Sequence, residues 1–294
     1  MTESDGGSSI VRRWQLAAAL KDLRERAGLT QDQAVERLHG GGGKWSTSKL
    51  SRVENREHGI RPREVEQLLD LYGVSDPVER EQLLTLAARA RERDWRYTYG
   101  PDLSMPLRTV VSLEADVIAI RQFEIMVVPG LLQTTDYTRA LIEATSPVTL
   151  SPIEVDRRVA LRMTRQHILR KERPPTIHVI LDEGVLRRVV GNRSIMRDQL
   201  RKLVDLASEP PLTLQVLPFG RGAGPGFNGP FTLLTLPEPT PDVLYGESGP
   251  SGMVFIEDQE RVRTYTLWHG MLTQLALSRG ESLEMLGEMA TSFE

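Results

Sequence analysis

The sequence predicts an N-terminal all-α domain of five helices and a C-terminal mixed α+β domain. Three observations support this prediction. The 294 residues exceed one typical domain of roughly 150 residues. Apolar residues recur at helical spacing up to about residue 93, whereas β-branched runs bounded by turn residues alternate with helical patterns after residue 175. We therefore expect two folded units joined by a linker.

Capping signals define the five helices of the N-terminal domain, which is expected over residues 10–95 after a disordered tail at 1–9. Thr30 forms a capping box with Gln33, Ser46 is an N-cap, and Trp45 can staple onto Leu50. The helices are expected over 11–27, from Thr30 to Leu38, from Ser46 onward, from Arg61–Pro62 to Gly73, and from Asp76–Pro77 to about Arg93.

The tyrosines, glycine and proline at 96–104 are typical of a linker, and the second domain is expected over 105–294. Helical spacing predicts its helices, and short β-branched or aromatic runs predict its strands. The helices are expected over 105–121, from about 135, and over 152–171, 183–190, 195–207, 258–278 and 281–289. The strands are expected over 176–181, 212–217, 231–236, 243–245 and 253–256, with a short strand or turn over 125–132.

The composition excludes several classes of protein. The chain has no cysteine, so disulfides, thiolate nucleophiles and cysteine-bound metal sites are excluded. Its N-terminus lacks the pattern of a signal peptide. The longest apolar run is interrupted by Pro129 and Gly130, and its length is far short of the ~20 residues that span a bilayer. We therefore expect a cytoplasmic protein that does not span a membrane.

No motif for catalysis, a cofactor or a metal ion is predicted. Gly224–Gly229 matches the dinucleotide fingerprint, but it contains a proline and precedes a strand, so we interpret it as a loop. The five histidines lack the spacing of a metal site. Asp182 and Glu183 are interpreted as the acidic first turn of a helix, with a carboxylate pair for acid–base catalysis as the alternative. The chain is therefore not expected to be an enzyme.

Positive charge is concentrated near the N-terminus. Residues 10–63 contain twelve Lys and Arg against six Asp and Glu, a net charge of +6, and the rest of the chain carries −9. A basic segment on an acidic chain is typical of a single nucleic-acid-binding module. Ordinary solvent-exposed helix faces can carry the same excess of Lys and Arg. Charge alone therefore leaves both interpretations open, a nucleic-acid-binding module and a set of solvated helices.

The segments 29–38 and 45–54 together resemble the helix-turn-helix of Xre/Cro-type repressors, and the resemblance covers about residues 11–73. Ala34 is small where the two helices cross, and Leu50 and Val53 point to the core at a spacing of three. The third helix can therefore enter the major groove of double-stranded DNA. Its polar positions are left outside: Thr47, Ser48, Lys49, Ser51, Arg52, Asn55 and Arg56.

The resemblance implies roles for individual residues in this DNA-binding set. Thr47, Ser48 and Arg52 match positions that read bases. Gln31, at the start of the second helix, and Asn55 match positions that bind backbone phosphates. The resemblance therefore implies that both helices of the motif contact an operator.

The resemblance also implies one structural pair and shows one departure. Arg24 and Glu54 match a charge pair that ties the first helix to the third. Six residues separate Leu38 from Trp45, roughly five more than is usual for the family. Because a longer flexible loop costs little extra closure entropy, we expect the fold to tolerate this glycine-rich insertion.

A second resemblance covers about residues 104–280. Leu113–Glu114 and Val128–Ala140 resemble the actinobacterial domain of unknown function that follows such a helix-turn-helix in WhiJ-like, antitoxin-like regulators. The resemblance implies that this domain receives a signal, either a ligand or a small partner protein encoded nearby. Later segments that fit are 186–191, 199–200, 214–218, 231, 245–247 and 276–278.

Together these features predict a sequence-specific, DNA-binding transcriptional regulator that carries no cofactor. A single helix-turn-helix reads few base pairs, so we expect a homodimer on a two-fold operator. The dimer contact is expected beyond about residue 104, because the short N-terminal helices use their apolar residues in their own core. Two alternatives stay open: an antitoxin-like interaction module that binds DNA mainly for autoregulation, and a ligand-sensing or enzymatic scaffold.

Overall fold

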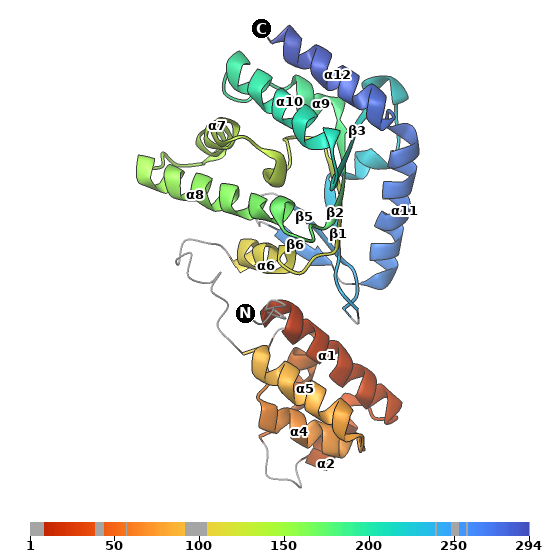
Figure 1. The fold of residues 1–294 in the computed structure, drawn as a ribbon. Coiled ribbons are helices and arrows are strands. Elements are labelled where there is room, and N and C mark those ends of the chain that lie inside the picture. Colours follow the sequence, from red (N-terminus) through yellow and green to blue (C-terminus); the bar gives the residue numbers. More distant parts are fainter. Residues whose placement is uncertain are drawn as a thin grey trace. The chain divides into compact units, whose positions relative to one another are not determined.

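The computed structural model describes residues 9–38, 44–56, 58–91, 105–238, 240–247, 253–256 and 258–293. The chain forms two compact units, Met1–Asp116 with Pro237–Thr240, and Val117–Leu236 with Pro241–Glu294 (Figure 1). The predicted tail apart from Ser9, the glycines at 40–43 and the predicted linker at 96–104 lie outside the described residues. No helix in the described ranges is both long and apolar enough to cross a membrane.

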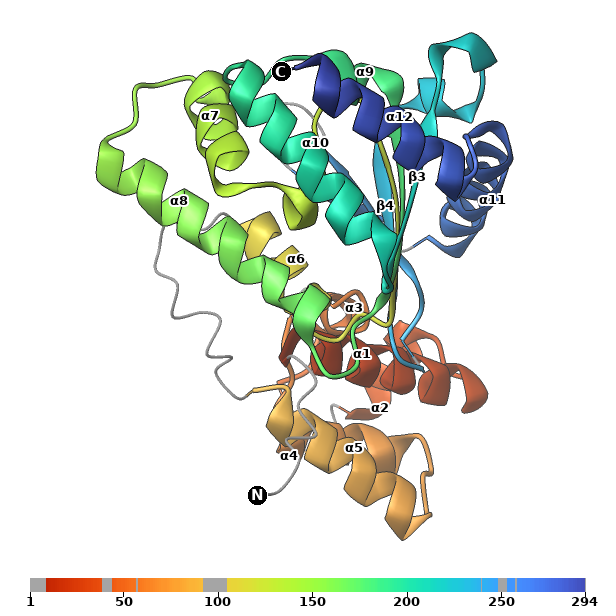
Figure 2. The same cartoon turned by 45° about the horizontal axis from the view of Figure 1, so that its top comes forward.

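The first unit is helical, as predicted, and it contains α6 (Met105–Glu114) in addition to the five predicted helices, whereas the sequence places residues from 105 onward in the second domain (Figure 2). Its other helices are α1 (Ser9–Arg26), α2 (Gln31–Leu38), α3 (Thr47–Glu54), α4 (Pro62–Leu71) and α5 (Pro77–Arg89). Helix α5 packs beside α1 and α4, and α3 packs against α1 and α2. Leu20, Leu50, Val65, Leu68 and Leu69 are completely buried in the shared core. The short helices are therefore stabilised by one common apolar cluster.

Local sequence signals explain where these helices begin and end. The Gln33 N–H donates to Thr30 Oγ1 at 3.2 Å, and the Thr30 N–H donates to Gln33 Oε1 at 2.9 Å, which completes the predicted capping box. Asp76 caps α5, whose first residue is a proline that needs no hydrogen-bond acceptor there. Gly28 and Gly73 follow α1 and α4 with positive φ, the conformation that ends many helices.

The second unit contains a six-stranded mixed sheet in the order β3-β2-β1-β4-β5-β6. Its strands are β1 (Ala119–Glu124), β2 (Thr176–Asp182), β3 (Leu212–Leu217), β4 (Phe231–Thr235), β5 (Val243–Glu247) and β6 (Met253–Ile256). Strands β1, β2 and β3 are parallel, so their carboxyl ends lie at one edge of the sheet. Strands β4, β5 and β6 continue the sheet in antiparallel order.

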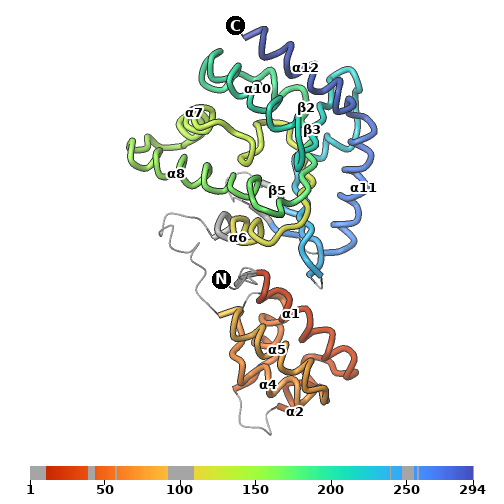
Figure 3. The backbone as a smooth tube through the Cα atoms, in the orientation of Figure 1, coloured from red at the N-terminus to blue at the C-terminus, as the bar shows by residue number. Residues whose placement is uncertain are grey.

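Helices cover both faces of this sheet. They are α7 (Thr135–Thr145), α8 (Pro152–Arg165), α9 (Glu183–Arg187), α10 (Arg193–Ser208), α11 (Gln259–Leu275) and α12 (Arg279–Ser292). Helices α7, α8 and α10 lie on one side and α11 lies on the other, as Figures 1 and 2 show and the trace in Figure 3 follows. Helix α12 packs on α10 and β3.

Apolar residues of the strands fill the layers between the sheet and its helices. Val179, Ile180 and Leu181 of β2 are all buried, because both faces of this central strand are covered. On the α11 side, Ile180 packs in one cluster with Phe231 and Leu272. The sheet is therefore a rigid frame for the loops that follow the carboxyl ends of β1, β2 and β3.

The prediction of a helix over 105–121 is wrong in its second half. Helix α6 ends at Glu114, and β1 occupies the following segment. The strand lacks an alternating pattern because polar Arg121 and Gln122 stand together between the buried residues Ile120 and Phe123. The segment 125–132, predicted as a strand or a turn, contains the 3-10 turn η3 (Gly130–Leu132).

Candidate nucleic-acid interface

Local contacts fix the start and the buried side of α3, the helix that the sequence predicts to enter DNA. Ser46 Oγ accepts a hydrogen bond from the backbone N–H of Lys49 at 3.1 Å, which caps the first turn. Trp45 is buried in the same cluster as Leu50 and Val53. These three side chains anchor one side of α3 in the core and turn its polar residues away from it.

A buried ion pair joins α1 to α3. Arg24 Nε donates to Glu54 Oε1 at 2.7 Å, and Arg24 Nη2 donates to Glu54 Oε2 at 2.9 Å. The hydrogen bond with Glu54 raises the pKa of Arg24 above its ordinary value, so the pair stays charged. Arg24 Nη1 also donates to the Leu29 carbonyl oxygen at 2.7 Å. One guanidinium therefore bridges α1, the turn before α2, and α3.

The polar side of α3, here called the open face, consists of Thr47, Ser48, Ser51, Arg52 and Asn55. Ser48, Arg52 and Asn55 are exposed. Arg52 Nε donates to the Ser48 carbonyl oxygen at 3.1 Å, and Asn55 Nδ2 donates to Ser51 Oγ at 3.2 Å. The two terminal nitrogens of Arg52 have no hydrogen-bond partner among the described residues. Such a guanidinium can donate to O6 and N7 of a guanine.

Two residues of α2 connect the open face to the ion pair. Thr47 Oγ1 donates to Asp32 Oδ1 at 2.7 Å, and Gln31 Nε2 donates to Glu54 Oε2 at 2.7 Å. Gln31 is the first residue of α2, where backbone N–H groups lack partners inside the helix and favour an anion. The Gln31 amide is thus held at this helix end by the carboxylate that also pairs with Arg24.

Lys49 and Arg56 lie beside the open face rather than on it. Lys49 Nζ donates to Glu64 Oε1 at 2.5 Å and lies 4.4 Å from the centroid of the Trp45 ring. Burial raises the pKa of Glu64, but hydrogen bonds, first that from Lys49, leave it below its ordinary value. Arg56 has a positive φ of 66°, and its guanidinium lies 5.1 Å from the Trp14 ring centroid. Both cations are engaged by the protein itself, which helical spacing alone does not predict.

The motif at 128–140 in the second unit forms a turn that is held by buried polar side chains. Gln133 Nε2 donates to the Val128 carbonyl oxygen at 2.7 Å, and Gln133 Oε1 accepts from Thr138 Oγ1 at 2.9 Å. The Val128 N–H donates to the Tyr137 hydroxyl oxygen at 3.3 Å. Gln133, Thr138 and Tyr137 are all buried. The buried polar side chains of this motif are therefore hydrogen-bonded within the turn.

Side chains of α10 complete the hydrogen bonds around this turn. Gln199 Nε2 donates to the Leu132 carbonyl oxygen at 2.9 Å, and Gln199 Oε1 accepts from the Thr134 N–H at 2.7 Å. Lys202 Nζ donates to the Gln133 carbonyl oxygen at 2.7 Å, and burial lowers the pKa of Lys202. These contacts give the turn a structural role, because its polar groups are occupied within the unit.

Comparison with known families separates the same two units. A family described as a helix-turn-helix domain matches residues 15–83, which contain α2, α3 and the open face. A family described as a domain of unknown function, DUF5753, matches residues 107–288. No curated protein and no solved structure matches the chain. Because the second match covers more than half of the 294 residues, the chain belongs to the DUF5753 family and carries a helix-turn-helix domain of the kind found in DNA-binding regulators.

Proposed function

We propose that this chain is a sequence-specific transcriptional regulator that inserts α3 into the major groove of an operator. The observation that carries the proposal is the open face, a row of polar side chains opposite the buried anchors Leu50 and Val53. A major groove admits a helix and presents base acceptors to donors such as a guanidinium. The net charge of +6 over residues 10–63 favours contact with the phosphate backbone by the same segment.

Within this proposal the side chains divide between bases and phosphates. Thr47, Ser48 and Arg52 read base edges, since they occupy the first turn and the middle of the open face. Gln31, at the start of α2, and Asn55, at the end of α3, bind phosphates on either side of the groove. Phosphate contacts fix the orientation of the helix, and base contacts select the sequence.

Contacts within the unit refine the expected roles of Thr47, Lys49 and Arg56. Because Thr47 already donates its hydroxyl proton to Asp32, its oxygen is left to accept a hydrogen bond from a base amino group. Lys49 and Arg56 support α3 through their contacts with the protein. They act on DNA as nearby positive charge rather than as readers of base edges.

In this proposal the second unit supplies the dimer contact and receives a signal in the cytoplasm without catalysing a reaction. Leu267 and Met271 lie one turn apart on α11 and are 65% and 51% exposed, which supports an apolar contact surface on that helix. The resemblance to WhiJ-like, antitoxin-like regulators favours a ligand or a small partner protein as the signal. A homodimer doubles the number of base pairs that one helix-turn-helix reads.

Selection of DNA from a random library by the full-length chain tests this proposal. We expect an inverted repeat whose half-sites lie about 10 base pairs apart, one helical turn, centre to centre. The variant Arg52→Ala should lose preference at one position of each half-site. Arg63→Ala, which removes an exposed arginine of α4, should keep every preference. Absence of any enriched sequence would contradict sequence-specific binding, and a single unpaired half-site would contradict the dimer.

A further inference from the structure

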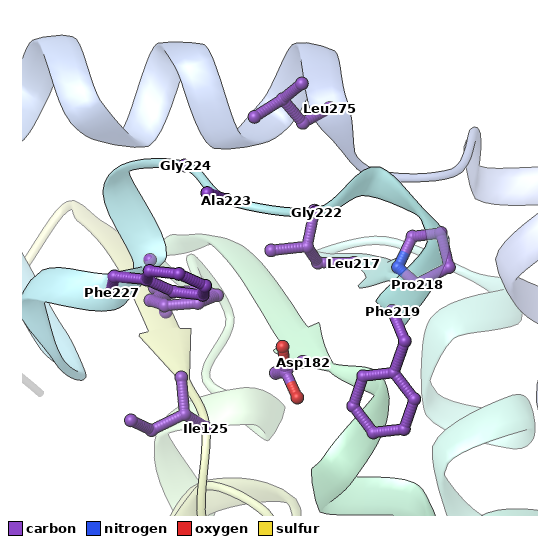
Figure 4. A pocket seen from close by; sticks show the side chains of 12 residues that line it. Ile125, Asp182, Leu217, Pro218, Phe219, Gly222, Ala223, Gly224, Phe227 and Leu275 are labelled. Carbon is purple, nitrogen blue, oxygen red and sulfur yellow. The ribbon is translucent and has the colours of Figure 1, made fainter.

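A cavity of about 610 Å³ lies in the second unit where the three parallel strands end (Figure 4). Each strand contributes a lining residue near its carboxyl end. Phe123 is the second-last residue of β1, Asp182 is the last residue of β2, and Leu217 is the last residue of β3. The loop after β3 and Leu275 of α11 close the other sides. In open sheets with parallel strands, ligands bind outside the carboxyl ends of the strands, and this volume suits a small molecule.

The walls of the cavity are mainly apolar and aromatic. Phe123 and Leu217 are buried in the core behind it. Phe219 and Phe227 also line it, yet they are 58% and 81% exposed, whereas Phe123 and Phe231 of the same unit are buried and those at 255 and 293 are half-buried. Two large rings left in solvent beside one cavity are typical of a binding site for an apolar group.

Glycines in the loop after β3 allow it to lie against the core and still leave this space open. A Cβ on Gly226 would lie 2.7 Å from Phe123 Cζ, and a Cβ on Gly224 would lie 3.2 Å from Leu275 Cδ1. A side chain at Gly226 would therefore require the loop or the Phe123 ring to shift, and one at Gly224 would require Leu275 to give by a few tenths of an ångström. The loop predicted at 224–229 enters the 3-10 turn η6 (Pro225–Asn228) and then β4, so it does not open a phosphate-binding helix.

Asp182 is the one ionisable side chain among the residues described around this cavity. Its Oδ1 accepts a hydrogen bond from the Gly184 N–H at 2.8 Å and caps α9, as the sequence predicts for an acidic first turn. Its second oxygen has no hydrogen-bond partner among the described residues. In Figure 4 the carboxylate lies at the centre of the lining, with Phe219 on one side and Phe227 on the other.

We propose that this cavity binds a small organic cation, an amine whose body is aromatic or apolar. The carboxylate of Asp182 pairs with the ammonium group, and Phe219 and Phe227 cover the body and face the positive charge. The lining has no lysine or arginine in its described part, so nucleotides and other phosphates lack a partner for their charge. The role of this amine as the regulatory signal rests on the proposed function; its binding does not.

Three indoles that differ in charge test the proposal on the full-length chain. They are tryptamine, which is a cation, 3-methylindole, which is neutral, and indole-3-acetate, which is an anion, each titrated by calorimetry without DNA. We expect tryptamine to bind about tenfold more tightly than 3-methylindole and indole-3-acetate to bind weakest. Absence of saturable tryptamine binding, or equal binding of the cation and the anion, would overturn the proposal.

Variants locate the binding in this cavity. Asp182→Asn should cut tryptamine affinity about tenfold and leave 3-methylindole unchanged, because an asparagine oxygen can still cap α9. Asp198→Asn, at an exposed aspartate of α10, should change neither. Phe227→Ala, at a side chain exposed enough to spare the fold, should weaken both ligands. Unchanged tryptamine affinity in Asp182→Asn or Phe227→Ala would overturn the site. Since no DNA is present, that result would leave the proposed reading of an operator standing.

Discussion

The helix-turn-helix of the first unit and the 128–140 motif of the second unit orient their polar side chains differently. In the first unit, the polar residues of α3 point outward, above a buried pair formed by Arg24 and Glu54. In the second unit, Gln133 points inward and binds the backbone and side chains of its own turn. A motif recognised in a sequence therefore marks either a contact surface or an internal frame, and the direction of its side chains distinguishes the two.

The buried groups of the two units also differ in charge. The first unit buries both members of the Arg24–Glu54 pair, whereas the buried polar groups of the second unit include amides and the imidazole of His269, and its buried carboxylate, Glu183, pairs with a guanidinium that is 57% exposed. A buried charge that loses its partner costs more than a buried neutral group that loses one. Substitutions and pH should therefore affect the two units by different amounts.

Breaking the ion pair has the largest expected effect. Arg24→Leu leaves the Glu54 carboxylate buried without its guanidinium and should cost about 3–5 kcal/mol of the free energy of unfolding of the first unit. Replacing both Arg24 and Glu54 by Leu should cost less, since no charge is left buried. Amide hydrogen exchange in α1 and α3 of the full chain measures both losses. A greater loss in the double variant would rule out this role for the pair.

Acid should destabilise the second unit next most strongly, through His269. Its ring lies 4.7 Å from that of His178, centroid to centroid. Burial, and then the neighbouring His178 and Arg121, lower the pKa of His269 from 6.5 to about 4. Because the unfolded chain takes up this proton first, stability present above pH 6.5 is lost as the pH falls towards 4. The loss should reach roughly 3 kcal/mol.

Hydrogen exchange in α11 between pH 4 and pH 7 measures this loss. His269→Leu should flatten the dependence of stability on pH, because the titrating group is removed. His58→Leu, at an exposed histidine of the first unit, is the matched control. It should leave the pH dependence of the stability measured in α11 unchanged. An unaltered slope in His269→Leu would show that another group titrates.

Removing one buried amide of the second motif should have a smaller effect. Gln133→Leu leaves the Val128 carbonyl oxygen and the Thr138 hydroxyl without that partner and should cost about 1–3 kcal/mol. The control Gln122→Leu, at a half-buried side chain of β1, should change stability by about 0.5 kcal/mol or less. Hydrogen exchange in α7 and β1 compares them, and equal costs would contradict an internal frame at this turn.

The helices of the first unit could be predicted because their signals lie within a few residues of each helix end. Thr30 with Gln33, Ser46, and Trp45 with Leu50 each act over three to five positions. The structure shows the first two as capping hydrogen bonds and places Trp45 and Leu50 in one core cluster. Strand β1 could not be predicted. Its Arg121 pairs with Asp242, which lies far away in the sequence, so no local pattern marks it as part of a sheet.

The candidate sites show the same limit of local patterns. Helical spacing separates buried from polar positions of α3, but it cannot show that Lys49 meets Glu64 or that Arg56 meets Trp14. The capping role of Asp182 follows from its neighbours in sequence, and the structure places it as the cap of α9. The cavity beside it could not be predicted, since three strand ends and one loop form its walls.

Substitution of Arg52 tests most directly the claim that the polar side chains of α3 form an outward contact surface, unlike the inward side chains of the 128–140 motif. The measurement is the affinity of the full chain and of Arg52→Ala for the selected operator and for random DNA at one salt concentration. Arg63→Ala, which removes a positive charge from α4, is the control. Gln31→Ala, at a predicted phosphate contact, should weaken both DNAs by similar amounts.

We expect Arg52→Ala to lose about 1–3 kcal/mol on the operator and little on random DNA, because its terminal nitrogens are free to donate to a base. Arg63→Ala should weaken both DNAs only slightly and to the same extent. Equal losses on both DNAs in Arg52→Ala would contradict base reading by the open face of α3.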